Sequence, residues 1–252
     1  MMPTVVVLAG GLGTRLRKVT DDKYPKPMVP VLYQDEEYPF LSFLLEYLKT
    51  QGAHHVVICL DHLGEKIESY FGDGRAFDLD IEYDTVHGVL TGARLKHAMR
   101  KVKESEFIVH CGDTYHPIDL QGFINHFESH PEITVQVSVV TTAHDPALNP
   151  NIAMNQDGMV TAYARDNVRG SQQGLETGIL AVRNNILDVL PDKAGVSLTE
   201  DVYPELIAQH RIRAYESNTL FFDIGTPDEY LEFCRYAQEH EIKPVSRNPV
   251  HF

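Results

Sequence analysis

The apolar residues of this chain follow two alternating patterns, short continuous runs and longer stretches of helical spacing. Continuous runs at residues 5–8, 56–60 and 107–111 are typical of strands that are buried on both faces of a parallel sheet. Residues 40–48 and 120–127 instead space their apolar side chains for one face of a helix. Because strands and helices alternate, we expect an α/β fold in which helices cover both faces of a mainly parallel sheet.

The second half of the chain has a different texture. Residues 159–165 and 175–182 alternate between apolar and polar positions, which predicts antiparallel or edge strands and thus a small antiparallel region. Thr199 is the expected N-cap of a helix over 199–209, and Pro227 suits the first turn of a final helix over 228–240. Further elements are expected over 66–71, 81–83, 93–102, 134–141 and 221–224. Since no repeat or linker separates these elements, we expect a single domain.

Composition narrows the class of protein. The 252 residues carry a formal net charge of −14, which argues against nucleic acid or an anionic membrane as a partner. The longest apolar run, FLSFLLEYL, is interrupted by Ser and Glu and is too short to cross a bilayer. The three cysteines form no CxxC pair and are interpreted as reduced thiols, so we expect a cytoplasmic protein.

The stretch LAGGLGTRL, residues 8–16, is a candidate phosphate loop. Glycines let backbone N–H groups approach an anion closely, and Arg15 could bind two phosphate oxygens at once. A tight strand-to-helix turn without any ligand would have the same glycines. A dinucleotide-binding loop is a further alternative, although Leu16 stands where that motif has its third glycine. A Walker loop is excluded because no GK[ST] follows.

Three more residues could complete such a site. Lys26 lies between two prolines in YPKPMVP, which hold its backbone stiffly, but the same pattern fits a solvated surface lysine. Asp113 and Asp223 each follow a predicted strand, where carboxylates could hold Mg²⁺ beside phosphates. A turn aspartate that caps the next helix is the alternative for Asp113.

The remaining sequence offers little other chemistry. His126 and His130 in HFESH are spaced to share one face of a helix, but no third metal ligand is evident, so exposed helix histidines are the favoured interpretation. No GxSxG or Cys/His signature for a catalytic nucleophile is present.

Five motifs together resemble one enzyme family. LAGGLGTRL, PKPMVPV, GDT, ETG and DIGTPDEY are similar, in this order, to motifs of the sugar-1-phosphate nucleotidyltransferases. The run PFLSFLLEYLKTQG with YFGDG is most similar to the branch that contains heptose-1-phosphate guanylyltransferases. The resemblance implies a Rossmann-like, three-layer α/β/α fold of the GT-A-like nucleotidyltransferase type. It also implies one domain over residues 1–252, with a mainly nucleotide-binding half at 1–118 and a mainly sugar-phosphate-binding half at 119–252.

The resemblance implies a Mg²⁺-dependent reaction of an NTP with a sugar 1-phosphate, which gives an NDP-sugar and pyrophosphate. Arg15, Lys26 and Asp113 would be catalytic, and Asp113 and Asp223 would hold the metal. The implied nucleotide-binding residues are Leu8, Ala9, Gly10, Gly11, Gly13, Thr14, Arg15, His87, Gly88 and Thr91. The implied substrate-binding residues are Lys26, Arg165, Glu176, Thr177 and Gly178.

Two stretches depart from the family pattern and leave the substrates open. YARDN has Arg165 as the candidate replacement for a phosphate-binding lysine, and HGVLTGARL has Leu90 and Arg94 where relatives have small residues. GTP is favoured, with CTP, UTP and dTTP possible. A cytidylyltransferase acting on a phosphonate or a phosphorylated amino alcohol, a nucleotide-sugar-dependent glycosyltransferase and a non-catalytic sensor are the alternatives. A homo-oligomer is also left open.

Overall fold

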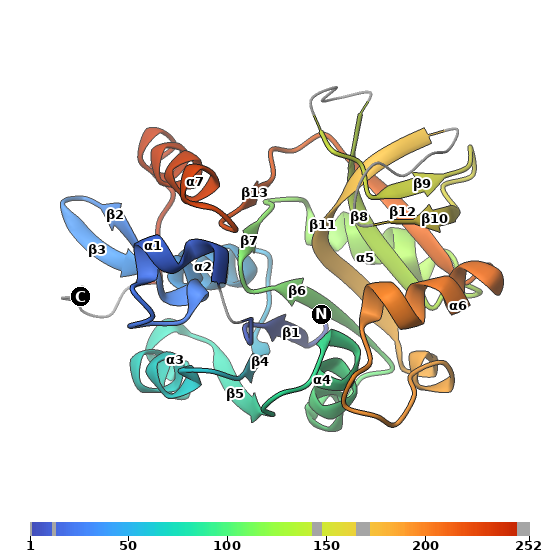
Figure 1. Cartoon of the computed structure of the whole chain (residues 1–252), viewed down its shortest axis with the longest axis horizontal. Helices are drawn as coiled ribbons and strands as arrows, with labels where there is room; N and C mark the ends of the chain where they lie inside the picture. Colours follow the sequence, from blue (N-terminus) through green and yellow to red (C-terminus); the bar gives the residue numbers. More distant parts are fainter. Residues whose placement is uncertain (1, 12–13, 143–147, 165–171, 246–252) are drawn as a thin grey trace. The chain divides into compact units, whose positions relative to one another are not determined.

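The computed structural model describes residues 2–11, 14–142, 148–164 and 172–245 (Figure 1). The chain forms two compact units, and each unit is assembled from separate segments. Unit 1 comprises Met1–His87, Cys111–Tyr115 and Phe222–Phe252, and unit 2 comprises Gly88–His110 and His116–Phe221. The expected functional halves at 1–118 and 119–252 stay a prediction, because the units follow contacts between distant segments rather than one point along the chain.

Three parallel strands form the centre of unit 1. Strand β1 (Val5–Leu8) pairs with β4 (His55–Leu60), and β4 pairs with β5 (Asp80–Thr85), all in parallel. The valines of β1 are completely buried, as the continuous apolar run predicts. Helices α2 (Phe40–Thr50) and α3 (Gly64–Phe71) connect these strands in sequence. The strand–helix alternation expected from the sequence is therefore present here.

An aromatic cluster in unit 1 fixes two very short strands. Strand β7 (Thr114–Tyr115) pairs antiparallel with β13 (Phe222–Asp223). Phe233 of helix α7 (Pro227–Glu239) packs against Tyr115 and Phe222, with ring centroids 5.3 and 5.9 Å away. It also contacts Phe40 of α2 at 4.8 Å. Because Asp113 precedes β7 and Asp223 ends β13, burial of Phe233 fixes the positions of both carboxylates.

Helix α7 begins as the sequence predicts, with Pro227 in its first turn and a capping box between Thr226 and Glu229. The hairpin of β2 (Pro30–Tyr33) and β3 (Glu36–Pro39), which the sequence did not predict, lies beside α7 (Figure 1). The Tyr230 hydroxyl of α7 donates a hydrogen bond to the carbonyl of Pro30. The hairpin comes shortly after Lys26 in the chain, so this hydrogen bond anchors the segment that carries Lys26 to the last helix.

Unit 2 contains the antiparallel region. Strand β11 (Gln172–Arg183) pairs antiparallel with β6 (Glu106–Cys111), β8 (Val135–Thr141) and β9 (Ile152–Met154). Strand β9 pairs with β10 (Val160–Tyr163), and β12 (Ile212–Ser217) pairs in parallel with β8. The antiparallel strands predicted over 159–165 and 175–182 are confirmed as β10 and β11, although β9 and β12 were not predicted.

The helices of unit 2 are α4 (Thr91–Ala98), α5 (Leu120–Glu128) and α6 (Tyr203–Ala208). Shorter helical turns over the two units are η1 (Thr14–Leu16), α1 (Arg17–Thr20), η2 (Lys26–Met28), η3 (Arg75–Phe77), η4 (Met99–Lys101), η5 (Asn184–Asp188) and the π-helix η6 (Leu198–Val202). The predicted cap at Thr199 is wrong. Ser197 caps this segment instead, because its Oγ accepts a hydrogen bond from the backbone N–H of Glu200.

Among the described residues, no helix has both the length and the apolar character that are needed to span a bilayer. The cytoplasmic location inferred from the sequence stays a prediction.

Candidate active site

The candidate phosphate loop leaves β1 at a point where three backbone segments meet. The backbone N–H of Ala9 donates to the carbonyl of Cys59, and that of Gly112 donates to the carbonyl of Leu8. A Cβ on Gly112 would lie 3.1 Å from the Cα of Ala9, so a side chain would crowd this approach. Glycine at 112 therefore lets the segment that carries Asp113 lie against the start of the loop.

The loop itself is open to a ligand where it is described. Gly10 is half-buried, and Gly11 is exposed with no atom within 4 Å of the position that a Cβ would occupy. Arg15, in the turn η1, is exposed. Gly13 lies outside the described residues, as does Arg165. The nucleotide-binding roles of Leu8, Ala9, Gly10, Gly11, Gly13 and Thr14 stay predictions.

Lys26 lies at the centre of the site. Its Nζ donates to Asp113 Oδ2 at 2.8 Å and to Asp223 Oδ1 at 3.1 Å. The lysine side chain is 7% exposed, whereas the two carboxylates are 39% and 34% exposed. The solvated surface lysine considered above is therefore not what the structure shows. Asp113 does not cap the following helix either, because the N-cap of α5 is Asp119.

The charges of this cluster do not balance. Burial by itself lowers the pKa of Lys26, but the carboxylates of Asp113 and Asp223 outweigh burial and raise it. Burial raises the pKa of Asp223, and the nearby Asp113 raises it further against the opposing effect of Lys26. Two carboxylates thus share one ammonium group, and the cluster can accept further positive charge.

The donor set of the cluster suits a hard cation. Carboxylate oxygens are the ligands that Mg²⁺ favours, and it usually binds one or two of them together with phosphate oxygens and water. Among the described residues, no group of three or more His, Cys, Asp and Glu side chains could hold a metal ion. Asp113 and Asp223 therefore fit a divalent ion that a bound polyphosphate helps to coordinate, not a closed protein cage.

Gly225 lies beside both Arg15 and Asp223. A Cβ on Gly225 would lie 3.0 Å from Arg15 Nη2 and 3.1 and 3.2 Å from the two oxygens of Asp223. The Arg15 guanidinium and the Asp223 carboxylate thus both lie next to the space that a side chain at residue 225 would fill. Because residue 225 has no side chain, both groups can occupy these positions.

Unit 2 holds a partly buried carboxylate at Glu176 of β11. Tyr203 of α6 donates from its hydroxyl to Glu176 Oε1 at 2.7 Å, and the backbone N–H of Glu176 donates to Asn151 Oδ1 at 2.8 Å. Burial raises the pKa of Glu176 to about 7, although the hydrogen bond from Tyr203 lowers it. Near neutral pH this carboxyl group is present in both protonation states.

The residues after Glu176 form an irregularity in the strand. The pairing of β11 with β8 shifts register between Glu176 and Leu180, and Gly178 has a φ of +81° that favours glycine. The hydroxyl of Thr177 is buried, where it contacts His116 Nδ1 at 2.9 Å and donates to the carbonyl of Ser138. Any contact of Thr177 with a substrate would thus come from its backbone, and its substrate role stays a prediction.

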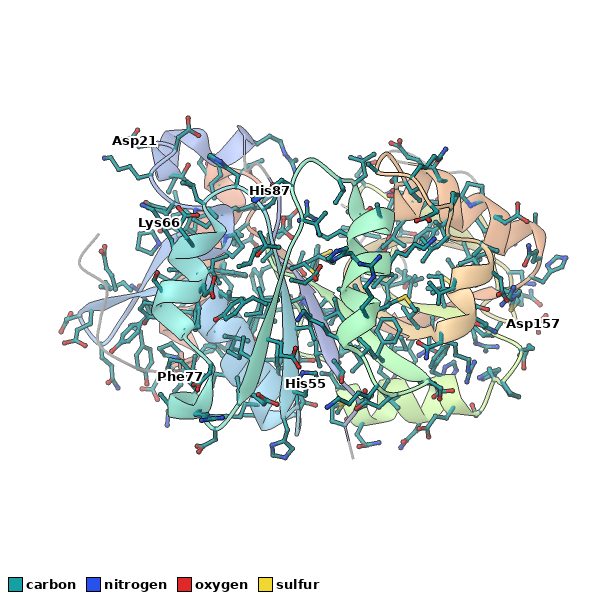
Figure 2. The ribbon with its side chains drawn as sticks, turned by 90° about the horizontal axis from the view of Figure 1, so that it is seen from below. Asp21, His55, Lys66, Phe77, His87 and Asp157 are labelled. Carbon is teal, nitrogen blue, oxygen red and sulfur yellow. The ribbon has the colours of Figure 1, made fainter. Side chains whose placement is uncertain are left out.

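The candidate base-binding stretch, residues 87–95, is divided between the units, with His87 in unit 1 and the residues from Gly88 onward in unit 2. His87, which Figure 2 labels, lies 3.1 Å from Asp61 Oδ1 through its Nδ1 and is largely exposed. In unit 2, Thr91 Oγ1 accepts from the backbone N–H of Leu198, and Arg94 Nη2 donates to the carbonyl of Val89. The nucleotide-binding roles of His87, Gly88 and Thr91 stay predictions.

Sequence reasoning missed two residues that position the candidate groups. Gly225 belongs to the DIGTP motif, but only the structure shows that its missing side chain makes room for Arg15. No sequence pattern marked Tyr203 as a site residue, because it is 27 positions away in the chain from Glu176, whose carboxylate it contacts.

The comparisons with known proteins agree on one family. The sequence profile of the family described as "Nucleotidyl transferase" matches residues 4–240. The chain is 30% identical over 230 residues to a mannose-1-phosphate guanylyltransferase of Mycobacterium tuberculosis, covering 90% of this chain and 62% of that protein. It is 28% identical over 236 residues to a D-glycero-alpha-D-manno-heptose 1-phosphate guanylyltransferase of Aneurinibacillus thermoaerophilus, covering 93% and 98%.

Among solved structures, HddC from Yersinia pseudotuberculosis is similar, with a TM-score of 0.77 and 28% identity over 94% of this chain and all of that one. The same protein has been solved in complex with GMP-PN, with the same score and identity. This likeness confirms the expected Rossmann-like α/β fold.

Glu176 makes stability depend on pH in a direction that can be measured. Its pKa of about 7 in the folded protein is above its ordinary value of 4.5, so the folded chain keeps a proton that the unfolded chain releases. This contribution to stability is complete at low pH and is lost as pH rises through about 7. We expect Glu176→Gln to gain about 1–3 kcal/mol in free energy of unfolding over the wild type between about pH 5 and 8.

Urea unfolding across that pH range measures this difference, and Glu205→Gln, at an exposed position of α6, is the matched control. Parallel stability curves for Glu176→Gln and the wild type would contradict the assigned protonation of Glu176.

Proposed function

Because the chain belongs to the nucleotidyl transferase family, which matches residues 4–240, we propose that it transfers a nucleoside monophosphate from an NTP to a sugar 1-phosphate. The products are an NDP-sugar and pyrophosphate. Relatives named as sugar-1-phosphate guanylyltransferases support this choice of reaction. The chain spans only 62% of the mycobacterial relative, so the proposal concerns the transfer reaction alone.

The observation that carries the proposal is the convergence of Lys26, Asp113 and Asp223. The three residues come from three separate segments of unit 1, and oxygens of Asp113 and Asp223 lie 2.8 and 3.1 Å from Lys26 Nζ. A site that brings two phosphate-bearing substrates together must supply positive charge and fix the reacting atoms. A chain with a net charge of −14 can do so only through such a local arrangement.

In the proposed reaction, a phosphate oxygen of the sugar 1-phosphate attacks the α-phosphorus of the NTP. The bond from this phosphorus to the oxygen that bridges it to the β-phosphorus breaks, and pyrophosphate leaves with that electron pair. Backbone N–H groups of the glycine loop bind the triphosphate, and Arg15 stabilises the charge that develops on the leaving group. Lys26 orients the two reacting phosphates. No covalent bond to the protein is formed.

We propose that Asp113 and Asp223 hold Mg²⁺, which would supply positive charge against the phosphate oxygens. Because Lys26 contacts both carboxylates, this lysine stays next to the phosphates on which the cation acts. Glu176 accepts hydrogen bonds from hydroxyl groups of the sugar, and Tyr203 orients its carboxylate. We favour GTP as the nucleotide, since HddC, at 28% identity, has been solved with GMP-PN.

The direct test is pyrophosphate release with Mg²⁺ from GTP, CTP, UTP, dTTP and ATP, each against a panel of sugar 1-phosphates, phosphonates and phosphorylated amino alcohols. We expect turnover with GTP and at least one heptose or hexose 1-phosphate. Turnover only with a phosphonate or a phosphorylated amino alcohol would keep the chemistry and replace the acceptor. No turnover with any pair would contradict the proposed function.

Substitutions in the charge cluster should lower turnover strongly. We expect Lys26→Met and Asp113→Asn each to lower kcat/KM by about 10²-fold or more, because each removes a charged group that acts on the reacting phosphates. Lys23→Met is the matched control, since the side chain of Lys23 is 71% exposed and pairs with exposed Asp21. It should leave kcat/KM within about 2-fold of the wild type. Equal effects of Lys26→Met and Lys23→Met would exclude the role given to Lys26.

Gly225 should act through Arg15. We expect Gly225→Ala to lower kcat by about 10-fold, because the added Cβ would lie 3.0 Å from Arg15 Nη2 and displace the guanidinium, while the flexible arginine limits the cost to the fold. In an Arg15→Ala background the same substitution should have little further effect. Gly195→Ala, where no atom lies within 4 Å of the added Cβ, is the control. Losses that multiply in the Arg15→Ala, Gly225→Ala double variant would show that Gly225 acts independently of Arg15.

A further inference from the structure

Unit 2 contains a polar cavity that the proposed reaction does not use. Its volume is about 460 Å³, and its lining includes His126 of α5, four residues of β12 and the turn between β9 and β10. That turn contributes Gln156 and Asp157, and Figure 2 labels Asp157. None of the lining residues belongs to the groups described above. The cavity is within the size range of small-molecule sites.

Arg213 supplies this cavity with a positive charge. The residue is half-buried, and its buried Nε has no hydrogen-bond partner among the described residues. Within the described part of the chain, its guanidinium makes no ion pair, although Asp157 and Glu216 also line the cavity. The chain has 36 acidic residues against 22 Lys and Arg, so an arginine that makes no ion pair with the described residues is unexpected here. A buried donor without an acceptor is costly, and a bound anion would satisfy it.

Arg211, two positions earlier on the same segment, shows the contrast. Its Nε donates to Thr134 Oγ1 at 2.8 Å, and its Nη1 donates to Gln209 Oε1 at 3.0 Å. The guanidinium of Arg211 is therefore bound by other side chains of the protein. The Nε of Arg213 has no such acceptor among the described residues and is available to a ligand. Arg211, in the loop before β12, is therefore a matched control for substitutions of Arg213 in β12.

His126 provides a second donor. Gln136 donates from its side-chain amide to the carbonyl of Phe123, so its Oε1 accepts from His126 Nδ1. The hydrogen of the neutral imidazole thus lies on Nδ1, and Nε2 remains for a ligand. Burial lowers the pKa of His126, Gln136 raises it, and Arg213 and His130 lower it again. An anion beside Arg213 would favour protonation of Nε2 and so gain another hydrogen bond.

We propose that this cavity binds a phosphorylated sugar, with Arg213 contacting two phosphate oxygens and His126 Nε2 donating to a third. Arginine matches the planar spacing of phosphate oxygens, which makes the guanidinium the charged anchor. The cavity is larger than a phosphate group alone requires. Gln156, Asp157 and Glu216 offer amide and carboxylate groups to the hydroxyls of a sugar, and the Tyr215 ring forms an apolar wall.

The test follows His126 by NMR in the full chain with ¹³C-labelled histidine, and His126→Gln assigns its signal. The probes are inorganic phosphate and glucose 6-phosphate, which lacks the 1-phosphate of the proposed acceptor, and glucose is the uncharged control. We expect both phosphate probes to shift the His126 signal saturably, with Kd near about 1 mM for the sugar phosphate. Glucose should not shift it.

Arg213→Gln should weaken this binding by about 10- to 100-fold, the range expected for loss of a charged hydrogen-bonding partner, while Arg211→Gln should not change it. Arg213→Lys, which keeps the charge but loses the planar fork, should weaken it less and also guards against a folding defect in Arg213→Gln. The proposal is overturned if neither phosphate probe shifts His126 at about 20 mM, or if the shift is unchanged in Arg213→Gln. A wild-type shift that Arg213→Gln retains would report phosphate bound elsewhere in the protein.

Discussion

The ion pairs of Lys26 with Asp113 and Asp223 are the contact on which the candidate active site depends. They join residues that are 87 and 197 positions apart in the chain. Prolines on both sides of Lys26 limit its backbone, and the lysine side chain is almost fully buried. The carboxylates stay partly exposed, so the cluster is stable enough to hold its geometry and open enough to bind phosphate and metal.

The packing around this cluster explains why such short strands can carry catalytic groups. Strands β7 and β13 have two residues each, too few to be stable by their own hydrogen bonds. The ring of Phe233 packs against Tyr115 and Phe222, so apolar burial holds the strands and the strands hold the carboxylates. Because Gly112 has no side chain, the segment that carries Asp113 can lie against the start of the phosphate loop. Because Gly225 has none, Arg15 can lie beside residue 225. The chemistry of unit 1 thus rests on its aromatic core.

The sequence predicted the parts that local patterns specify. Buried strands appear as apolar runs, and the start of α7 follows from Thr226, Pro227 and Glu229. The motifs marked Lys26, Asp113 and Asp223 as candidates, but their spacing could not show that they meet. Only the ordered resemblance to a family suggested it, because contacts between residues 87 and 197 positions apart leave no periodicity in the chain.

The features that the sequence did not predict are those that depend on distant partners. Strand β12 and the cavity beside it form where α5, β12 and the turn after β9 meet, and no local pattern records that meeting. The bond from Tyr203 to Glu176 links a short helix to a strand irregularity. Arg213 illustrates the same limit, since the sequence does not distinguish it from Arg211, which makes hydrogen bonds that Arg213 Nε lacks among the described residues.

A double-mutant cycle on the free energy of unfolding tests the central contact most directly, with Lys26→Met, Asp223→Asn and the combined variant measured without ligands. If the lysine is held by the carboxylate as described, the two substitutions should couple by about 1–3 kcal/mol, because either one alone leaves a partly buried charge without its partner. Additive effects, with a coupling below about 0.3 kcal/mol, would contradict the account of the site.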